Sequence, residues 1–245
     1  MKKQVSILGI PFDVLTETQA LNLLLSYLDE PRNHIITTPN PEAVMQARRS
    51  ADFYNALMGA ELRLADGIGI LIASRILKNS RLPGRVRGVD ICFALFKALS
   101  ENKRPTTVYI LGGGPGVAEA AKIKTETFYP VLQIVGFNDG YLNPEKEKII
   151  EQEITEKQPE MVLVCMGMPR QELWAARYKD LPVRLTLCLG GTLDILAGKV
   201  KLSPGWMRVI GLEWLHRLLR QPSRAKRMLD LPRFMLAVVR DVLNV

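Results

Sequence analysis

The chain has 245 residues, 47% of them apolar and 24% charged, so it can bury a core without disulfides or metal ions. This composition excludes disordered and collagen-like proteins, and no run of about 18 apolar residues is available to span a membrane. Three scattered cysteines and the lack of a signal-peptide pattern at the N-terminus predict a protein of the reducing cytoplasm.

The excess positive charge is concentrated at the C-terminal end. The 33 basic and 25 acidic side chains give a net charge of +8. Residues 199–245 contain 10 basic and 3 acidic side chains, a net charge of +7, whereas residues 1–198 contain 23 and 22. Trp206 and Trp214 lie in the same segment. A basic segment with tryptophans favours an anionic partner: a membrane surface, a phosphate ligand or a nucleic acid.

Short apolar runs alternate with helical patterns through residues 1–198. The runs are rich in Val, Ile and Leu, which is typical of strands buried on both faces. This alternation predicts an α/β fold with a mostly parallel sheet flanked by helices. We expect strands at 5–7, 34–37, 62–65, 108–111, 132–135, 161–166 and 185–189, and helices at 16–28, 41–58, 68–78, 89–100, 117–128, 144–157 and 171–179.

The pattern changes near residues 202–204, beyond which helical segments follow one another. We therefore expect a core at 1–202 and a helical, basic appendage at 203–245. One helix is predicted over 206–220, with a broad apolar face and a basic one. A basic amphipathic helix with tryptophan is typical of an in-plane membrane anchor. The alternative is that these helices pack on the core or in an oligomer, with their tryptophans buried.

Polar residues directly after the predicted strands are the first candidates for chemistry, because parallel sheets bind ligands beyond the C-terminal ends of their strands. Thr38 and Asn40 follow one strand, and Asn40 before Pro41 is also a good helix start. Asp66 follows another strand, where a carboxylate can act as a general base, bind ribose or cap a helix. Gln171 follows a third, where its amide can hydrogen-bond a base or a sugar.

Glycines follow two further strands. A glycine turn between strand and helix offers backbone N–H groups to a phosphate, although Val117 stands where a dinucleotide fingerprint has its third glycine. These glycines are candidates for nucleotide binding, with a plain tight turn as the alternative. They are Gly112, Gly113 and Gly114 after one strand, and Gly190 and Gly191 after the other.

The loop at 82–90 carries Arg85 and Arg87, and guanidinium groups suit a diphosphate unless the loop is simply solvated. The sequence contains only two histidines and no zinc cluster, Walker loop or nucleophile elbow. This pattern favours a metal-independent transferase or another nucleotide-binding enzyme. A nicotinamide-dependent oxidoreductase using the 112–114 loop and Asp139, and a non-enzymatic nucleic-acid or membrane module, remain as alternatives.

Seven short motifs then stand in order along nearly the whole chain. Together they resemble the WecG/TagA/CpsF glycosyltransferase family, although the glycine loop departs from the family pattern in its extra glycine and Pro115. The motifs are Thr-Pro-Asn-x-Glu at 38–42, Ala-Asp-Gly-x-Gly at 65–69, Arg-Val-x-Gly-x-Asp at 85–90, Gly-x-Pro-x-Gln-Glu at 167–172, Gly-Gly-x-x-Asp at 190–194, Ala-Gly-Lys-Val-Lys at 197–201 and Leu-Glu-Trp-Leu-x-Arg at 212–217.

The resemblance implies a Rossmann-like, inverting, metal-independent glycosyltransferase without a cofactor, acting at the inner face of the cell membrane. TagA-like members move N-acetylmannosamine from UDP to undecaprenyl-diphosphate N-acetylglucosamine, with a β-1,4 linkage, for wall teichoic acid. Other members use the uronic acid form of the sugar or make capsule and exopolysaccharide. The implied partners are a UDP-sugar, a polyprenyl-diphosphate-sugar and the membrane, without nucleic acid; the donor sugar stays open, as does a homo-oligomeric state.

The resemblance also assigns roles to residues. Asp66 matches the family's proposed base, which deprotonates the attacking hydroxyl. Thr38, Asn40 and Gln171 match polar residues that orient the sugar or the nucleotide. Without a metal, the departing UDP needs positive groups, and the candidates are Arg85 and the appendage arginines Arg217, Arg224 and Arg227.

Overall fold

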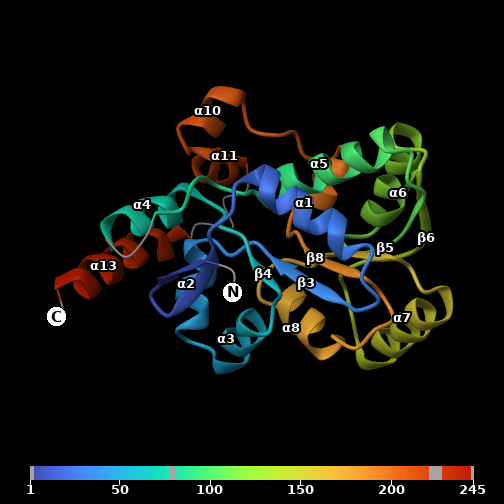
Figure 1. Ribbon diagram of the computed structural model, residues 1–245, viewed down its shortest axis with the longest axis horizontal. Helices are drawn as coiled ribbons and strands as arrows, with labels where there is room; N and C mark the ends of the chain where they lie inside the picture. Colours follow the sequence, from blue (N-terminus) through green and yellow to red (C-terminus); the bar gives the residue numbers. More distant parts are fainter. Residues whose placement is uncertain (1–2, 78–80, 221–227, 244–245) are drawn as a thin grey trace.

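A six-stranded parallel sheet forms the centre of the protein, whose computed structural model describes residues 3–77, 81–220 and 228–243 (Figure 1). Its strands lie in the order β4-β3-β8-β7-β5-β6. The side chains of β3, β4, β5, β7 and β8 are buried apart from one in β5, as expected for strands covered on both faces, whereas the edge strand β6 is partly exposed. The predicted α/β fold is confirmed, with β3 (His34–Thr37), β4 (Leu62–Arg63), β5 (Thr106–Gly112), β6 (Leu132–Asn138), β7 (Met161–Cys165) and β8 (Leu185–Cys188).

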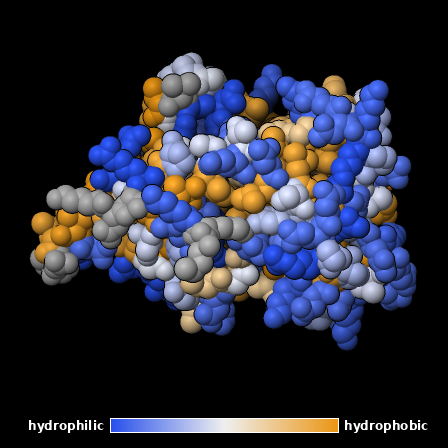
Figure 2. Space-filling view, viewed as in Figure 1, coloured by the Kyte–Doolittle hydropathy of each residue, from blue (hydrophilic) through white to orange (hydrophobic). Residues whose placement is uncertain are grey.

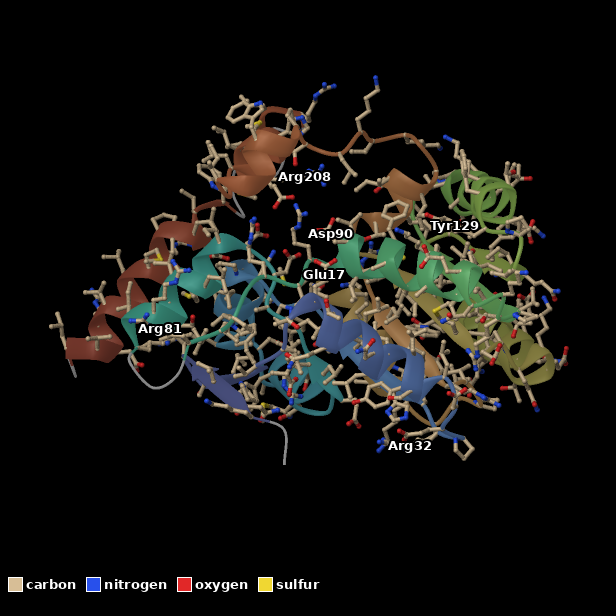
Figure 3. All side chains as sticks on the ribbon, turned by 45° about the horizontal axis from the view of Figure 1, so that its top comes forward. Glu17, Arg32, Arg81, Asp90, Tyr129 and Arg208 are labelled. Atoms are coloured by element: carbon tan, nitrogen blue, oxygen red, sulfur yellow. The ribbon has the colours of Figure 1, made fainter. Side chains whose placement is uncertain are left out.

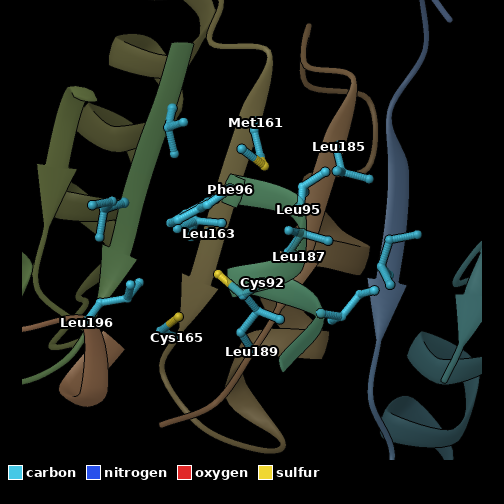
Figure 4. Close-up of a cluster of buried hydrophobic side chains, with 14 of the residues drawn as sticks. Cys92, Leu95, Phe96, Met161, Leu163, Cys165, Leu185, Leu187, Leu189 and Leu196 are labelled. Carbon is cyan, nitrogen blue, oxygen red and sulfur yellow. The ribbon is translucent and has the colours of Figure 1, made fainter. Parts of the chain in front are cut away.

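One face of the sheet is covered by α1 (Glu17–Tyr27), α5 (Gly88–Glu101), α6 (Val117–Phe128) and α9 (Thr192–Leu196). The apolar side of α5 presses on β7 and β8, where Cys92 and Leu95 lie among the strands' leucines (Figure 4). All three cysteines are free thiols buried in the core. The close packing on this face holds the strand ends, and the loops that follow them, in fixed positions.

The opposite face is covered by α7 (Pro144–Lys157) and α8 (Arg170–Arg177). α3 (Ala51–Met58) packs against α8. Sequence periodicity predicts one helix over 41–58, but the structure has two. The first, α2, covers Pro41–Ala47. Ser50 then caps α3, because its hydroxyl oxygen accepts the backbone N–H of Phe53 at 3.3 Å. The chain thus turns between two short helices instead of running straight away from the sheet.

An antiparallel hairpin lies outside the sheet and consists of β1 (Gln4–Ile7) and β2 (Ile10–Asp13). The predicted strand at 5–7 therefore exists but is not part of the parallel sheet. β2 was not predicted, since Pro11 and Asp13 interrupt its apolar run. Asp13 is buried because its Oδ2 accepts the backbone N–H of Arg63 at 2.8 Å, which ties the hairpin to β4.

The appendage contains α10 (Gly205–Val209), α11 (Glu213–Arg220) and α13 (Asp230–Leu243). The single helix predicted over 206–220 is interrupted at Gly211, which has a φ of +80° that helices do not contain. α13 packs on α2 and on α4 (Ile68–Ile76), and its Phe234 and Val238 are fully buried beside the hairpin. For α13, the structure therefore shows packing on the core, which was the alternative to a free membrane anchor.

Apolar side chains remain exposed on the outer side of the appendage, visible over α13 at the left of Figure 2. None of the helices in the described ranges is both long and apolar enough to cross a membrane. The exposed set comprises Trp206, Ile210, Trp214, Leu219, Leu229, Leu236, Val239, Val242 and Leu243.

Candidate active site

A cavity of about 200 Å³ opens beyond the C-terminal ends of β3, β4, β7 and β8. The segments that follow these four strands form most of its wall, and the loop before α5 and part of the appendage complete it. This is the position at which parallel sheets bind ligands. The tertiary structure brings these sequence-predicted residues together here: Thr38, Asn40, Asp66, Arg85, Gln171, Gly190 and Gly191.

The first wall is built by the segment after β3. Asn40 caps α2, since its Oδ1 accepts the backbone N–H of Ala43 at 2.9 Å. Thr38 donates its hydroxyl to the carbonyl of Cys188 at 3.5 Å, a contact between the ends of β3 and β8. The capping interpretation of Asn40 is therefore confirmed, while its position in the cavity wall leaves a second role open to it.

Asp66 lies in the neighbouring wall, after β4. Its backbone N–H donates to the carbonyl of Pro39 at 3.1 Å, which holds this loop to the one before α2. A Cβ added at Gly69 would stand 2.7 Å from Cγ of Pro41, so no side chain fits there. The glycine of the Ala-Asp-Gly-x-Gly motif thus allows the loops of Asp66 and Asn40 to meet in one wall.

Gln171 ties the ends of β7 and β8 together. Its Oε1 accepts the backbone N–H groups of Gly167 at 3.2 Å and Gly190 at 2.9 Å. Its Nε2 donates to Oε1 of Glu172 at 2.8 Å. The amide of Gln171, which is predicted to orient a ligand, therefore also joins two strand ends. Its second Nε2 hydrogen makes none of these three hydrogen bonds and can be donated to a substrate.

Glu172 is a cavity residue that the sequence predicts as one of the polar side chains after β7, together with Arg170 and Gln171, but without a specific role. Its side chain is 6% exposed, and its Oε2 has no hydrogen-bond partner among the described residues. Burial raises the pKa of this carboxyl to about 7, although the hydrogen bond from Gln171 lowers it. The carboxyl can therefore carry a proton near neutral pH. The motif that contains Gln171 was the signal that could have pointed to such a role.

Arg85 and Arg87 meet an acidic side chain of the appendage. Their Nη1 atoms donate to the carboxylate of Glu213, at 3.3 Å from Arg85 and 2.7 Å from Arg87. Arg87 also pairs with Asp90, and Arg85 donates to the carbonyl of Arg208 at 2.5 Å. Figure 3 labels Asp90 and Arg208, which belong to the core and the appendage sides of this junction.

The charge state of Arg87 follows from these neighbours. Burial disfavours its charged guanidinium, but the carboxylates of Glu213 and Asp90 together outweigh burial and raise its pKa. The cation is thus permanent at any physiological pH. The alternative of a merely solvated loop does not describe Arg85 and Arg87, whose side chains are only 15% and 16% exposed.

The glycine loop after β5 does not line this cavity. A Cβ at Gly112 would stand 2.4 Å from the carbonyl carbon of Cys165, so this glycine permits close packing of β5 on β7. Gly113 donates its N–H to the same residue's carbonyl at 3.2 Å. Nothing in the lining connects Gly112, Gly113 or Gly114 with the predicted site, and a nucleotide role for them stays a prediction. Asp139, the acidic residue of the oxidoreductase alternative, forms an ion pair with Lys146 at 2.7 Å and does not line this cavity either.

The appendage reaches the cavity through Gly211, Trp214, Met228 and Leu231. Of the three predicted appendage arginines, Arg217 belongs to α11, but its side chain is not among those described. Arg224 and Arg227 lie outside the described residues.

A second cavity of about 430 Å³ adjoins the first, and Gly191 and Glu213 line both. Its wall combines Lys199, Lys201 and Arg220 with the carboxylate of Asp194. Across the described ranges, no three His, Cys, Asp or Glu side chains come together as metal ligands.

Comparison with known proteins finds a matching family model and similar curated relatives, two of which are described here by name. Residues 5–245 match the family model described as "Glycosyl transferase WecG/TagA/CpsF family". An N-acetylglucosaminyldiphosphoundecaprenol N-acetyl-beta-D-mannosaminyltransferase of Bacillus subtilis (strain 168) is 34% identical over 221 residues, 89% of this chain and 84% of that protein. Its namesake of Bacillus spizizenii (strain ATCC 23059 / NRRL B-14472 / W23) is 31% identical over 220 residues, with the same coverage of 89% and 84%.

Proposed function

The chain belongs to the WecG/TagA/CpsF glycosyltransferase family, and from this membership we propose that it transfers N-acetylmannosamine from UDP to N-acetylglucosamine on undecaprenyl diphosphate. The observation that carries the proposal is the convergence of Asp66, three polar side chains and two guanidiniums in one cavity at the C-terminal edge of the sheet. The names of both relatives supply the acceptor and the sugar. The product would enter wall teichoic acid or a related surface polymer.

Asp66 acts as the general base in this proposal. Its carboxylate takes the proton of the acceptor's sugar hydroxyl as that oxygen bonds to the anomeric carbon of the donor. The bond from the anomeric carbon to the β-phosphate oxygen breaks at the same time, and the electron pair leaves with UDP. Attack from the face opposite the leaving group inverts the anomeric configuration, and the carboxylate ends protonated.

The departing UDP gains negative charge, which positive groups and N–H donors stabilise in place of a metal ion. We assign this task to Arg85 and Arg87, which line the same cavity as Asp66 and Gly191. We add Arg217, Arg224 and Arg227 of the appendage on the strength of the family resemblance. Thr38, Asn40 and Gln171 orient the sugar.

The two adjoining cavities suit a sugar nucleotide better than either alone. Small-molecule sites usually enclose about 300–1,000 Å³, so the first cavity, with about 200 Å³, accommodates only part of such a molecule. We place the sugar beside Asp66 in the first cavity and the nucleotide toward the second, where Lys199, Lys201 and Arg220 offer positive charge.

We also propose that the protein acts at a membrane surface. A lipid-linked acceptor places the reacting hydroxyl near the bilayer. The appendage combines exposed apolar side chains on α10, α11 and α13 with most of the chain's excess positive charge. Apolar area and basic charge together favour binding to anionic lipid.

The test is the release of UDP from UDP-N-acetylmannosamine, with a short-chain polyprenyl-diphosphate N-acetylglucosamine as acceptor and EDTA present. We expect acceptor-dependent release that Asp66→Asn reduces by about 10²-fold or more, the range of a general base. Release with EDTA supports metal independence. A folded protein that releases UDP only from the uronate donor would correct the sugar, and failure with every UDP-sugar would overturn the proposal.

A further inference from the structure

We propose that Glu213 is a positioning residue of the donor site: it holds Arg85 and Arg87 in the orientation that receives the diphosphate, and it fixes α11 against the core. The identity of the anion rests on the proposed function. The bridge itself does not, because it is a feature of the described side chains.

The geometry joins two parts of the chain that are far apart in sequence. Each carboxylate oxygen of Glu213 accepts from a different guanidinium, Oε2 from Arg85 and Oε1 from Arg87. The hydrogen bond from Arg85 to the carbonyl of Arg208 adds a second link to the appendage. Glu213 is the first residue of α11, so this bridge holds the N-terminal end of that helix against the core.

The bridge lies where the reaction needs positive charge. Arg85, Arg87 and Glu213 all line the first cavity, and Glu213 lies in the wall shared with the second. A diphosphate that links a sugar in one cavity to a nucleotide in the other passes this shared wall. Glu213 is therefore next to the expected leaving group without being a group that the reaction consumes.

Charge and burial explain why a carboxylate is required here. The three side chains are 15–17% exposed, and two guanidiniums this close would repel each other without a shared partner. A buried charge that loses its partner is strongly destabilising. Glu213 and Asp90 together balance the charges of the two guanidiniums. Since a guanidinium has five N–H donors and each of these uses only two in the described contacts, donors remain for phosphate oxygens.

The decisive variant is Glu213→Gln, which keeps the size of the side chain but removes its charge. We expect the KM for the sugar nucleotide to rise about tenfold and kcat to fall, since both arginines lose the charge of the partner that they share. In an Arg87→Gln background the same change should cost less than about threefold, because residues that act as a unit are non-additive. An equal loss in both backgrounds would overturn the role assigned to the bridge.

Two matched controls separate this role from general stabilisation. Glu147→Gln removes a more exposed ion pair, to Arg177 at 2.6 Å, between the helices on the opposite face of the sheet, and should leave KM unchanged. Asp230→Asn removes another ion pair between core and appendage, to Arg49 at 2.5 Å, and neither of these residues lines the first cavity. If Asp230→Asn raises the donor KM as much as Glu213→Gln, Glu213 is only a link and our proposal is wrong.

Binding and exchange measurements keep the test independent of turnover. We expect calorimetry to show weaker UDP binding in Glu213→Gln, and hydrogen exchange to show faster exchange over 205–220. Unchanged UDP binding would contradict positioning, and tighter binding would mean that Glu213 competes with the phosphates for the two arginines. If the wild-type protein turned over no sugar nucleotide, the proposed function would fail, whereas unchanged exchange in the variant would specifically overturn the bridge.

Discussion

Asn40 both caps a helix and lines the cavity. Its Oδ1 caps α2, which the Asn-Pro pair predicts from sequence, and its side chain also lies in the cavity wall. The cap uses the carbonyl oxygen only, which leaves the amide N–H groups for a ligand. Capping is confirmed, and contact with the sugar or nucleotide stays a prediction.

Replacing Asn40 separates these roles. Asn40→Ala should lower the free energy of unfolding by about 1 kcal/mol, because α2 loses its cap. Asn40→Asp keeps a capping oxygen and should retain that stability. If the amide orients the substrate, both variants lose activity, as measured by UDP release. Full activity of Asn40→Asp would mean that the cap is the only task of this residue.

Glu172 makes the stability of the protein depend on pH. Burial raises its pKa from 4.5 to about 7, so the folded form holds a proton that the unfolded form releases above pH 4.5. Below pH 4.5 this carboxyl is protonated in both forms and does not make the free energy of unfolding depend on pH. Between pH 4.5 and about 7 the free energy of unfolding falls as pH rises, and above about pH 7 it no longer changes through this group.

Glu172→Gln removes this ionisation while preserving the shape of the side chain. The stability of the variant relative to wild type should rise with pH, by up to about 1.4 kcal/mol per pH unit within that window. Chemical denaturation of both proteins at about pH 5 and about pH 8 measures the difference. An identical difference at the two values would show that the carboxyl is ionised in both folded and unfolded forms.

At the scale of elements, α13 has two apolar sides with different surroundings. Phe234 and Val238 are fully buried against α2 and α4, whereas Leu236 is 60% exposed on the same helix. The exposed side explains why the sequence pattern alone suggests a membrane anchor. The buried side explains why α13 nevertheless packs on the core.

The two sides should respond differently to truncation. Phe234→Ala should lower the free energy of unfolding by about 3–5 kcal/mol if α13 unfolds together with the core. Leu236→Ala, the matched control, should change it by no more than about 0.5 kcal/mol. Denaturation curves test this, and limited proteolysis detects early release of α13. Equal effects of both substitutions would contradict the packing described here.

For the whole molecule, the appendage completes a cavity that the core begins. Gly211, Trp214, Met228 and Leu231 lie in its wall, and the bridge through Glu213 joins it to the donor side. Catalysis and the position of the appendage are therefore coupled in our proposal.

Deleting residues 203–245 should abolish turnover and leave the sheet and its helices folded, at lower stability because the partners of Phe234 become exposed. Circular dichroism and UDP release measure the two properties separately. A truncated protein with undiminished activity would exclude any catalytic role for the appendage.

Membrane binding is the second property of the whole molecule that can be measured. Vesicles with anionic lipid should bind the protein more tightly than neutral ones. Binding should weaken when salt rises from about 0.1 M to about 1 M, since the Debye length falls from about 10 Å to about 3 Å. Leu236→Glu with Val239→Glu should reduce binding, whereas Ile149→Glu, on exposed α7, should not. Equal binding of all variants would place the lipid contact elsewhere.

The sequence by itself determined the α/β architecture, the strand ends that carry Thr38, Asn40, Asp66 and Gln171, and the family. These features are local: buried strands need continuous apolar runs, and helix starts need capping side chains. The hairpin strand at 10–13 was missed because burial of Asp13 depends on a distant backbone N–H, from Arg63.

Only the tertiary structure decided which of these residues meet. Gly112 lies against Cys165 outside the cavity, and Arg85 and Arg87 pair with Glu213. Glu172 is buried, which raises the pKa of its carboxyl. None of these outcomes follows from a periodicity, because each depends on the distance between segments far apart in the chain. Side-chain burial and ion pairing are properties of three-dimensional proximity, and a linear pattern does not contain them.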